Sequence, residues 1–211
     1  MTKNKLLILT ALKAEATPFI QHYKLRKKEF IESKSLYYSE TITLLITGIG
    51  NTNVQNTLQN YCNQKQIKQH DFIVNIGVAG GSADLGKIGD LFLIKKIISE
   101  TGGPAYYSNI LFKHGMNEAS LTTVNNPVVD GNETYDGLVD MEALGIWNIL
   151  KSIIPNDRFI FLKVISDYMD NKCLDLKSFN KLATNIIIYQ LIPITKLLNT
   201  LQGIEIIDTP L

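Results

Sequence analysis

Residues 42–81, ITLLITGIGNTNVQNTLQNYCNQKQIKQHDFIVNIGVAGG, contain the clearest pattern of secondary structure in the sequence. Two short apolar runs in this stretch, Ile42–Ile46 and Phe72–Ile76, lack the spacing of an amphipathic helix and predict buried strands. Between them, Val54 to Lys68 has apolar residues at helical spacing among glutamines and asparagines, which predicts a crossover helix. We therefore expect the two strands to be parallel.

The same alternation continues on both sides of this stretch. Further strands are predicted at Leu6–Thr10, Asp90–Ile98, Glu118–Val124 and Phe159–Ile165, and helices at Ala14–Gln21, Glu142–Lys151 and Ser178–Leu201, the last bent or started at Pro193. Gly102–Met116 has no clear period and predicts a long loop or a strand excursion. Alternating strands and helices predict an α/β fold whose mostly parallel sheet is covered on both faces, with functional groups at the carboxyl ends of the strands.

The composition bounds the class of protein. The chain has 211 residues, 45% of them apolar and 19% charged, and no repeat or Pro/Ser-rich linker, so a single domain over residues 1–211 is expected. Twenty-one basic and twenty acidic residues leave a formal charge of +1, which makes nucleic acid an unexpected partner. The one short basic run, Lys24–Lys28, is interpreted as a solvated helix end or loop.

The cysteines and the apolar runs indicate the setting. Cys62 and Cys173 lack CxxC spacing and clustered histidines, so we expect no metal, no disulfide framework and a reduced, cytoplasmic location. Leu6–Leu9 is too short for a signal-peptide core or a membrane span, so no membrane partner is expected. No cofactor is expected either, since no dinucleotide fingerprint is complete.

Glycines follow two of the predicted strands. In Thr47–Asn53 (TGIGNTN), backbone amides could face an anion or a sugar hydroxyl, and a tight turn without a ligand explains the pattern equally well. In Asn75–Gly81 (NIGVAGG), three glycines within five residues indicate close approach of the backbone to a ligand or to another chain segment.

Acidic residues follow other predicted strands. Asp140 and Glu142 open a helix, where an acidic first turn ordinarily complements the helix dipole. Ser166 and Asp167 leave the apolar strand before them and could cap a following helix. Glu15, just beyond the first strand, would by itself be one surface glutamate among many. Each therefore has a structural interpretation beside a functional one.

The order of these motifs resembles the methylthioadenosine/S-adenosylhomocysteine nucleosidase branch of the nucleoside phosphorylase superfamily. The residues that match are Ala11–Glu15, Gly48–Asn51, Asn75–Gly81, Val139–Ala143 and Val164–Asp167. The resemblance spans nearly the whole chain and fits least well from Tyr106 to Tyr135. It implies a three-layer α/β/α sandwich around a mixed, strongly curved central sheet.

The resemblance also implies roles for individual residues. Asp167 would be the general acid at N7 of the departing purine, and Ser166 would orient it. Glu142 would accept hydrogen bonds from the ribose 2′- and 3′-hydroxyls, and Met141 would lie against the sugar. Glu15 would hold and deprotonate the attacking water.

Further positions are implied around the nucleoside. Val78, Ala79, Gly80 and Val128 would line the binding site, with Val78 standing where the family typically has serine. Lys163 stands where these enzymes usually have an arginine near the water; it keeps the charge and loses the bidentate fork.

The arginines and aromatic residues differ from those of related enzymes. Superfamily phosphorylases bind phosphate through arginines, and Arg26 and Arg158 both lie far from the glycine motifs in sequence, which favours hydrolysis. Asn125–Val129 lacks the aromatic residue that stacks on adenine in the family. The candidates for a stacking ring are Tyr106, Tyr107, Phe112 and, since such enzymes commonly complete their sites across a homodimer, Phe179 of a partner subunit.

The expected function is therefore hydrolysis of the N-glycosidic bond of a purine nucleoside, such as methylthioadenosine or S-adenosylhomocysteine. The alternatives are a phosphate-dependent phosphorylase, a futalosine-type hydrolase and, from another class, a catalytically silent nucleoside-binding module.

Overall fold

The computed structural model describes residues 3–29, 35–64, 67, 70–130, 135, 137–170 and 175–203. The strands are β1 Leu6–Thr10, β2 Arg26–Glu29, β3 Ser35–Tyr38, β4 Ile42–Ile46, β5 Phe72–Gly80, β6 Leu91–Ser99, β7 Tyr106–Tyr107, β8 Asn117–Thr123, β9 Leu138–Asp140 and β10 Phe159–Asp167. The helices are α1 Lys13–His22, α2 Asn51–Gln64, α3 Ala143–Leu150, α4 Leu176–Tyr189 and α5 Leu191–Leu201, with a short 3₁₀ helix at Asn156–Arg158.

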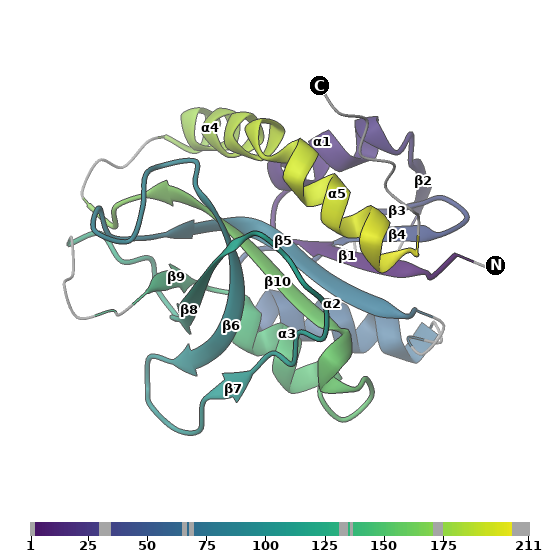
Figure 1. Cartoon of the computed structure of the whole chain (residues 1–211), viewed down its shortest axis with the longest axis horizontal. Helices are drawn as coiled ribbons and strands as arrows, with labels where there is room; N and C mark the ends of the chain where they lie inside the picture. The colour runs from purple at the N-terminus through teal and green to yellow at the C-terminus, as the bar shows by residue number, and fades with distance from the viewer. Residues whose placement is uncertain are drawn as a thin grey trace.

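The strands form one mixed sheet whose two halves differ in shape (Figure 1). In one half, β1 lies between β4 and β5 and is parallel to both, so the predicted parallel orientation of β4 and β5 is confirmed with β1 inserted between them. In the other half, β5 pairs with β10, β10 with β6, β6 with β8, β8 with β9, and β9 returns to β5 at Gly80. This half closes on itself, which confirms the mixed, curved sheet.

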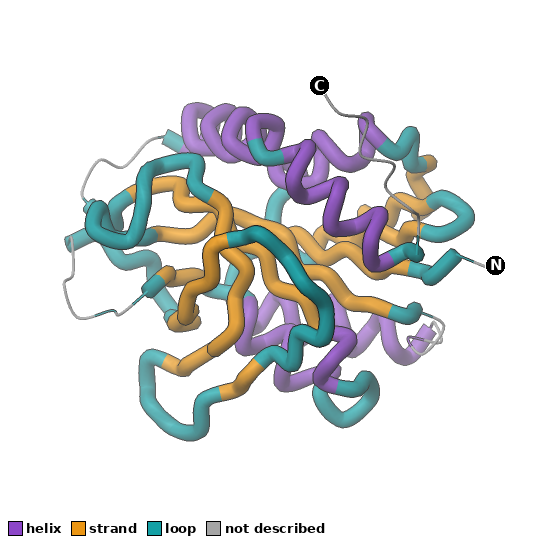
Figure 2. Tube along the Cα trace, in the orientation of Figure 1, coloured by secondary structure: helices purple, strands orange, loops and turns teal. Residues whose placement is uncertain are grey.

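Helices cover both faces of the sheet (Figures 1 and 2). The apolar faces of α2 and α3 pack into one buried cluster, and those of α1, α4 and α5 pack into a second cluster on the opposite face. The expected three-layer arrangement is therefore confirmed. None of the described helices combines the length and the apolar character that crossing a membrane requires.

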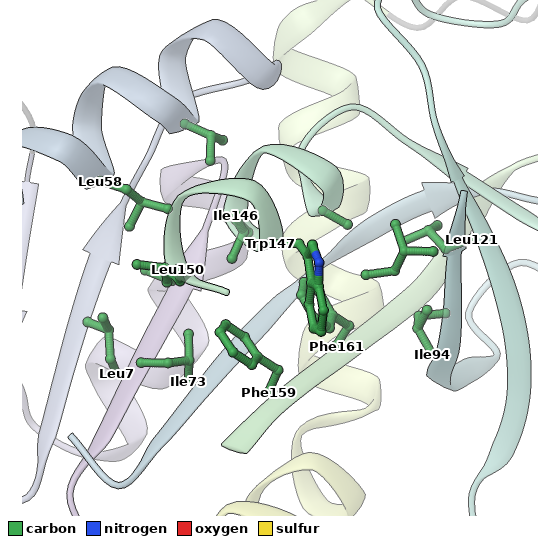
Figure 3. Packing of buried hydrophobic residues seen from close by; sticks show 14 of the residues in the cluster. Leu7, Leu58, Ile73, Ile94, Leu121, Ile146, Trp147, Leu150, Phe159 and Phe161 are labelled. Atoms are coloured by element: carbon green, nitrogen blue, oxygen red, sulfur yellow. The ribbon is translucent and has the colours of Figure 1, made fainter. Parts of the chain in front are cut away.

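Strand β10 explains why some of these strands are apolar at every position. Phe159 and Phe161 point into the cluster under α2 and α3, whereas Ile160 and Leu162 belong to the cluster on the other face. The ring of Trp147, on α3, lies 5.1 Å from that of Phe159 between centroids (Figure 3). A strand buried on both faces has no polar side to alternate with.

Three short strands, β2, β3 and β9, were not predicted. Arg26–Glu29, part of which was interpreted as a helix end or loop, is β2 at the sheet edge, paired with β3. The guanidinium of Arg26 lies over the ring of Tyr38, 5.3 Å from its centroid. Charged side chains on an edge strand discourage pairing with another chain, so this basic run is compatible with a strand.

The predicted helix over Ser178–Leu201 is two helices. The break falls at Gln190, and Pro193 is the third residue of α5 instead of a bend within one helix. Proline has no amide hydrogen to donate to the carbonyl four residues earlier, so it fits a first turn well and is disfavoured in a helix interior. The segment from Gly102 to Met116 includes the two-residue strand β7, as a strand excursion would.

The packing of β10 leads to a stability prediction. Phe159 is fully buried, so Phe159→Ala should lower the free energy of unfolding by about 3–5 kcal/mol through lost burial and the cavity left behind. Tyr189→Ala, at an 80% exposed position on α4, is the matched control and should cost little. Urea denaturation followed by circular dichroism measures both, and equal losses would contradict the assignment of the core.

Candidate functional site

The last residues of β5, β9 and β10, together with the residues that follow β1 and β8, line one cavity of about 600 Å³, a size typical of small-molecule sites. It is lined by Ala11, Leu12, Glu15, Ile49, Val78, Ala79, Gly80, Ile88, Val124, Pro127, Val128, Val129, Val139, Asp140, Met141, Glu142, Ser166, Asp167, Tyr168, Met169, Asp170, Phe179 and Leu182. Every residue expected at the site lies on this wall except Lys163. Motifs far apart in the sequence therefore meet in one place.

Glu15 lies in the first turn of α1 and is almost fully buried. Its Oε2 accepts hydrogen bonds from the amides of Ala11, at 2.9 Å, and Leu12, at 2.8 Å, and its Oε1 accepts one from Val78, at 2.9 Å. Burial raises the pKa of Glu15 above its ordinary value, although these amides and the charge of Lys163 oppose the rise. Glu15 is thus a fixed carboxylate with enhanced basicity, not a surface residue.

Lys163, in the middle of β10, does not reach the cavity. Its side chain is 1% exposed, and its Nζ lies 2.8 Å from Oδ2 of Asp140, whose side chain is fully buried. Burial alone would lower the pKa of Lys163, but the surrounding carboxylates outweigh it and raise the pKa above the ordinary value. Lys163 was expected near the water at the nucleoside site; in the structure its ammonium pairs with Asp140 and lies behind the residues that line the cavity.

Asp140, at the end of β9, connects three elements. Its Oδ1 accepts a hydrogen bond from the hydroxyl of Thr123, at 2.7 Å, and its Oδ2 accepts one from the amide of Ala143, at 2.9 Å. The Thr123 hydroxyl oxygen in turn accepts from the amide of Leu144, at 3.1 Å. These bonds satisfy amides at the start of α3, as a cap does, and fix that helix against the sheet.

Glu142 immediately precedes α3 and lines the cavity. Its Oε1 accepts a hydrogen bond from the amide of Gly50, at 2.8 Å, so that amide faces a side chain of the protein. Burial and the nearby charge of Asp140 raise the pKa of Glu142 to about 7, against the opposing effects of Lys163 and the Gly50 amide. Glu142 can therefore change protonation state near neutral pH.

Asp167 is held at the end of β10. Its Oδ2 accepts a hydrogen bond of 2.6 Å from the hydroxyl of Ser166, and its Oδ1 accepts one of 2.9 Å from the amide of Met169. The register of β10 against β5 shifts between Ile165 and Asp167, so Ser166 lies in an irregularity that turns the next side chain toward the cavity. No helix begins at this pair, so the capping interpretation does not apply.

Two glycines of β5 leave room for these carboxylates. A Cβ on Gly77 would lie 3.0 Å from Oε1 of Glu15, and one on Gly80 would lie 3.3 Å from Oδ1 of Asp167 and 2.6 Å from Cγ of Met169. The glycines predicted to mark close approach therefore do so, and what approaches is the side chains of the site.

The rest of the wall is mainly apolar. Met141, Val78, Ala79 and Val128 line it as expected, together with Phe179 of this same chain. The other aromatic candidates are absent from the described lining residues. Tyr106 packs instead on Trp147, with 5.4 Å between ring centroids.

Sequence reasoning missed several cavity residues. Tyr168, Met169 and Asp170 line it beside Asp167, and Asp140 had been considered only for its effect on the helix dipole. The signal for Asp140 was present in the sequence, since a lysine inside an otherwise apolar strand needs a buried anion. No comparable signal distinguished Ile49 or Ile88, which also line the cavity.

The arrangement suits proton transfer around a small molecule. A paired carboxyl and serine (Asp167 and Ser166), a titratable carboxyl (Glu142) and an amide-held carboxylate (Glu15) line an otherwise apolar space. General acid and general base catalysis both need groups of this kind within reach of one substrate. In the described part of the chain, no three or more His, Cys, Asp or Glu side chains are arranged to hold a metal ion.

The raised pKa of Glu142 gives a prediction for stability. A carboxyl with an ordinary pKa of 4.5 and a folded-state pKa of about 7 binds more protons when folded, so stability should fall as pH rises through that interval. Glu142→Gln removes this loss, so the variant should gain stability relative to wild type by a few kcal/mol between pH 5 and pH 8. Glu118→Gln, at an exposed carboxylate whose pKa lies below its ordinary value, should show no such gain. Denaturant titrations at both pH values measure the difference, and parallel curves would contradict it.

Solved structures share this architecture at low sequence identity. No family model matches the chain, and no curated protein matches it significantly in sequence. The 5′-methylthioadenosine nucleosidase of Arabidopsis thaliana superposes with a TM-score of 0.75 at 18% identity, over 96% of this chain and 98% of that one. The Helicobacter pylori nucleosidase with 5′-methylthioadenosine in its active site gives 0.74 at 15%, over 95% and 100%. The futalosine hydrolase of Helicobacter pylori gives 0.72 at 16%, over 93% and 98%. This chain therefore has the fold of the methylthioadenosine/S-adenosylhomocysteine nucleosidases.

Proposed function

We propose that this protein hydrolyses the N-glycosidic bond of a purine nucleoside. The observation that supports it is the meeting of Asp167 with its serine, Glu142 and amide-held Glu15 on the wall of one cavity. Asp167 protonates the departing base, Glu142 binds the ribose hydroxyls, and Glu15 takes the proton of the attacking water. Each of these groups lines the cavity.

The chemistry of the bond explains why such a set is needed. As the bond breaks, positive charge develops on the sugar and negative charge collects on the base. A proton donor at the base and carboxylates near the sugar stabilise both charges in a site with little water. A carboxylate held by three amides can then receive the proton of a water that adds to the sugar carbon.

The lining favours water over phosphate as the acceptor. The described residues that line the cavity include five acids and no arginine, lysine or histidine; the acids are Glu15, Asp140, Glu142, Asp167 and Asp170. Arg158 lines a separate pocket with Phe72 and Leu201. A phosphate anion would meet negative charge here without a cation to pair with, and burying it would be costly.

We propose an adenine nucleoside such as methylthioadenosine or S-adenosylhomocysteine as the substrate. The similar structures include nucleosidases of these compounds and one with 5′-methylthioadenosine bound, and the wall here is apolar beyond its acids. Futalosine is the second candidate, since a futalosine hydrolase has the same fold. The described lining residues include no cation, which favours a neutral nucleoside such as methylthioadenosine over the carboxylate-bearing futalosine.

The proposal includes a cytoplasmic homodimer. Three apolar residues line the cavity and are also substantially exposed, namely Ile49, Ile88 and Val129. A second copy covering this apolar rim would remove it from water and close the cavity. The spacing of the cysteines supports a reducing compartment.

The direct test is release of free base by the purified full chain. The panel contains methylthioadenosine, S-adenosylhomocysteine, adenosine, inosine and futalosine, each with and without phosphate. We expect release that does not depend on phosphate and is fastest for an adenine nucleoside. Release only with phosphate would make the protein a phosphorylase, and no release, with nucleoside binding retained, would make it a binding module.

Two substitutions test the roles of the acid and the base. Asp167→Asn should lower kcat by at least about 100-fold with little loss of stability, because it removes a general acid. Glu15→Gln should abolish turnover and retain nucleoside binding, since the amide side chain still fills the space. Asp157→Asn, in the 3₁₀ helix away from the cavity, is the control. Steady-state kinetics measure turnover, and calorimetric titration measures nucleoside binding. If Glu15→Gln loses binding as well as turnover, Glu15 anchors the substrate instead of acting as the base.

A further inference from the structure

The buried ammonium of Lys163 is a group that the proposed mechanism does not use. It lies in the centre of an apolar strand, is 1% exposed, and does not line the cavity. Its bond to Asp140, at 2.8 Å, joins two side chains that are both removed from water. Burying an ion pair is costly and is often no more stabilising than an apolar pair, so stability alone does not explain it.

The charge of Lys163 acts on three carboxylates from different elements. Asp140 comes from β9, Glu142 from the start of α3 and Glu15 from α1, and each affects the pKa of Lys163. The strands on either side of β10 place uncharged residues opposite Lys163, Gly77 on β5 and Phe92 on β6. One positive charge thus interacts with three acidic side chains, whose formal negative charge exceeds it.

The backbone is shaped to let Lys163 approach Glu15. Gly77 is paired with Lys163 across β5 and β10, and a Cβ there would lie 3.5 Å from Nζ of Lys163 and 3.0 Å from Oε1 of Glu15. A side chain at this position would crowd the Glu15 carboxylate and the Lys163 ammonium, so glycine leaves room for both beside β5. Because both groups are buried, water screens the interaction between their charges less than it would at the surface.

We propose that Lys163 is a positioning residue for the reaction proposed above: held behind the wall by Asp140, it keeps Glu15 and Glu142 charged and oriented toward the cavity without touching the substrate. The inference rests on the proposed function. It differs from a water-binding role, in which the cation itself would face the cavity. It accounts for the buried pair, for the glycine opposite it and for the absence of Lys163 from the wall.

The proposal has a consequence for the pH dependence of turnover. The charge of Lys163 lowers the pKa of Glu15 and of Glu142, opposing burial, whereas the charge of Asp140 raises the pKa of Glu142. If Glu15 must be ionised to accept a proton, activity is lost on the acid side as the carboxylates protonate. Without the charge of Lys163, the loss of activity at acid pH should therefore begin at a higher pH. Without the charge of Asp140, it should begin at a lower pH.

The experiment measures kcat/KM for the best substrate of the panel as a function of pH. Lys163→Met should move the acid limb to higher pH by about 1 unit or more, as expected for losing an opposite charge at close range. Asp140→Asn should move the limb to lower pH, and Lys163→Arg, which keeps the charge, should leave it near that of wild type. Lys95→Met removes a lysine from an exposed ion pair on β6 and is the matched control, with an unmoved limb.

A merely structural role would lower activity at every pH and leave the limb in place, or would move it in the same direction in both variants. Either result would overturn the role of Lys163 while turnover by wild type upheld the proposed function. If Lys163→Met does not fold, Lys163→Gln, which also removes the charge, takes its place, and an unmoved limb in that variant overturns the role. Wild-type protein that releases no base at any pH would overturn the proposed function and this role together.

Discussion

Strand β5 pairs with three neighbouring strands, and the curvature of the sheet and the position of the cavity both depend on these pairings. Along its length it lies between β1 and β10, and at its last residue, Gly80, it also pairs with β9. A strand can do this only where the sheet curves strongly enough for β9 to return to it. The curvature brings the ends of strands from both halves of the sheet to one cavity, so Asp167 on β10 and Glu15 beside β1 face the same space.

Such convergence creates an electrostatic problem, because several of the converging side chains are acidic. Each acidic side chain is stabilised by its own set of neighbouring groups. Glu15 is surrounded by three amides, Asp167 by a hydroxyl and an amide, and Asp140 by a lysine, a threonine and the first turn of α3. Glu142 accepts a short hydrogen bond from the amide of Gly50, and burial with the nearby charge of Asp140 raises its pKa to about 7. The hydrogen bonds hold the converging carboxylates in defined positions.

Most of the central strands and helices could be predicted from the sequence because they are buried on both faces or amphipathic. The sequence also indicated the cavity residues that follow strand ends, including Glu15, Glu142 and Asp167. Short strands such as β2 and β9 could not be found, since three or four residues give no period and edge strands contain charges. The partner of Lys163 could not be assigned either, because its bond to Asp140 depends on how β9 meets β10 across the curved half of the sheet. Nor could the sequence tell whether the amide of Gly50 would face a ligand or a side chain.

The bond between Gly50 and Glu142 connects the starts of two helices. The glycine precedes α2, the glutamate precedes α3, and the 2.8 Å hydrogen bond spans the wall of the cavity between them. One carboxylate oxygen of Glu142 is therefore held by the protein itself. The Glu142 side chain consequently has little rotational freedom to lose when a ligand binds. Preorganisation of this kind lowers the entropic cost of association, so this part of the wall resembles a rigid template more than an adaptable pocket.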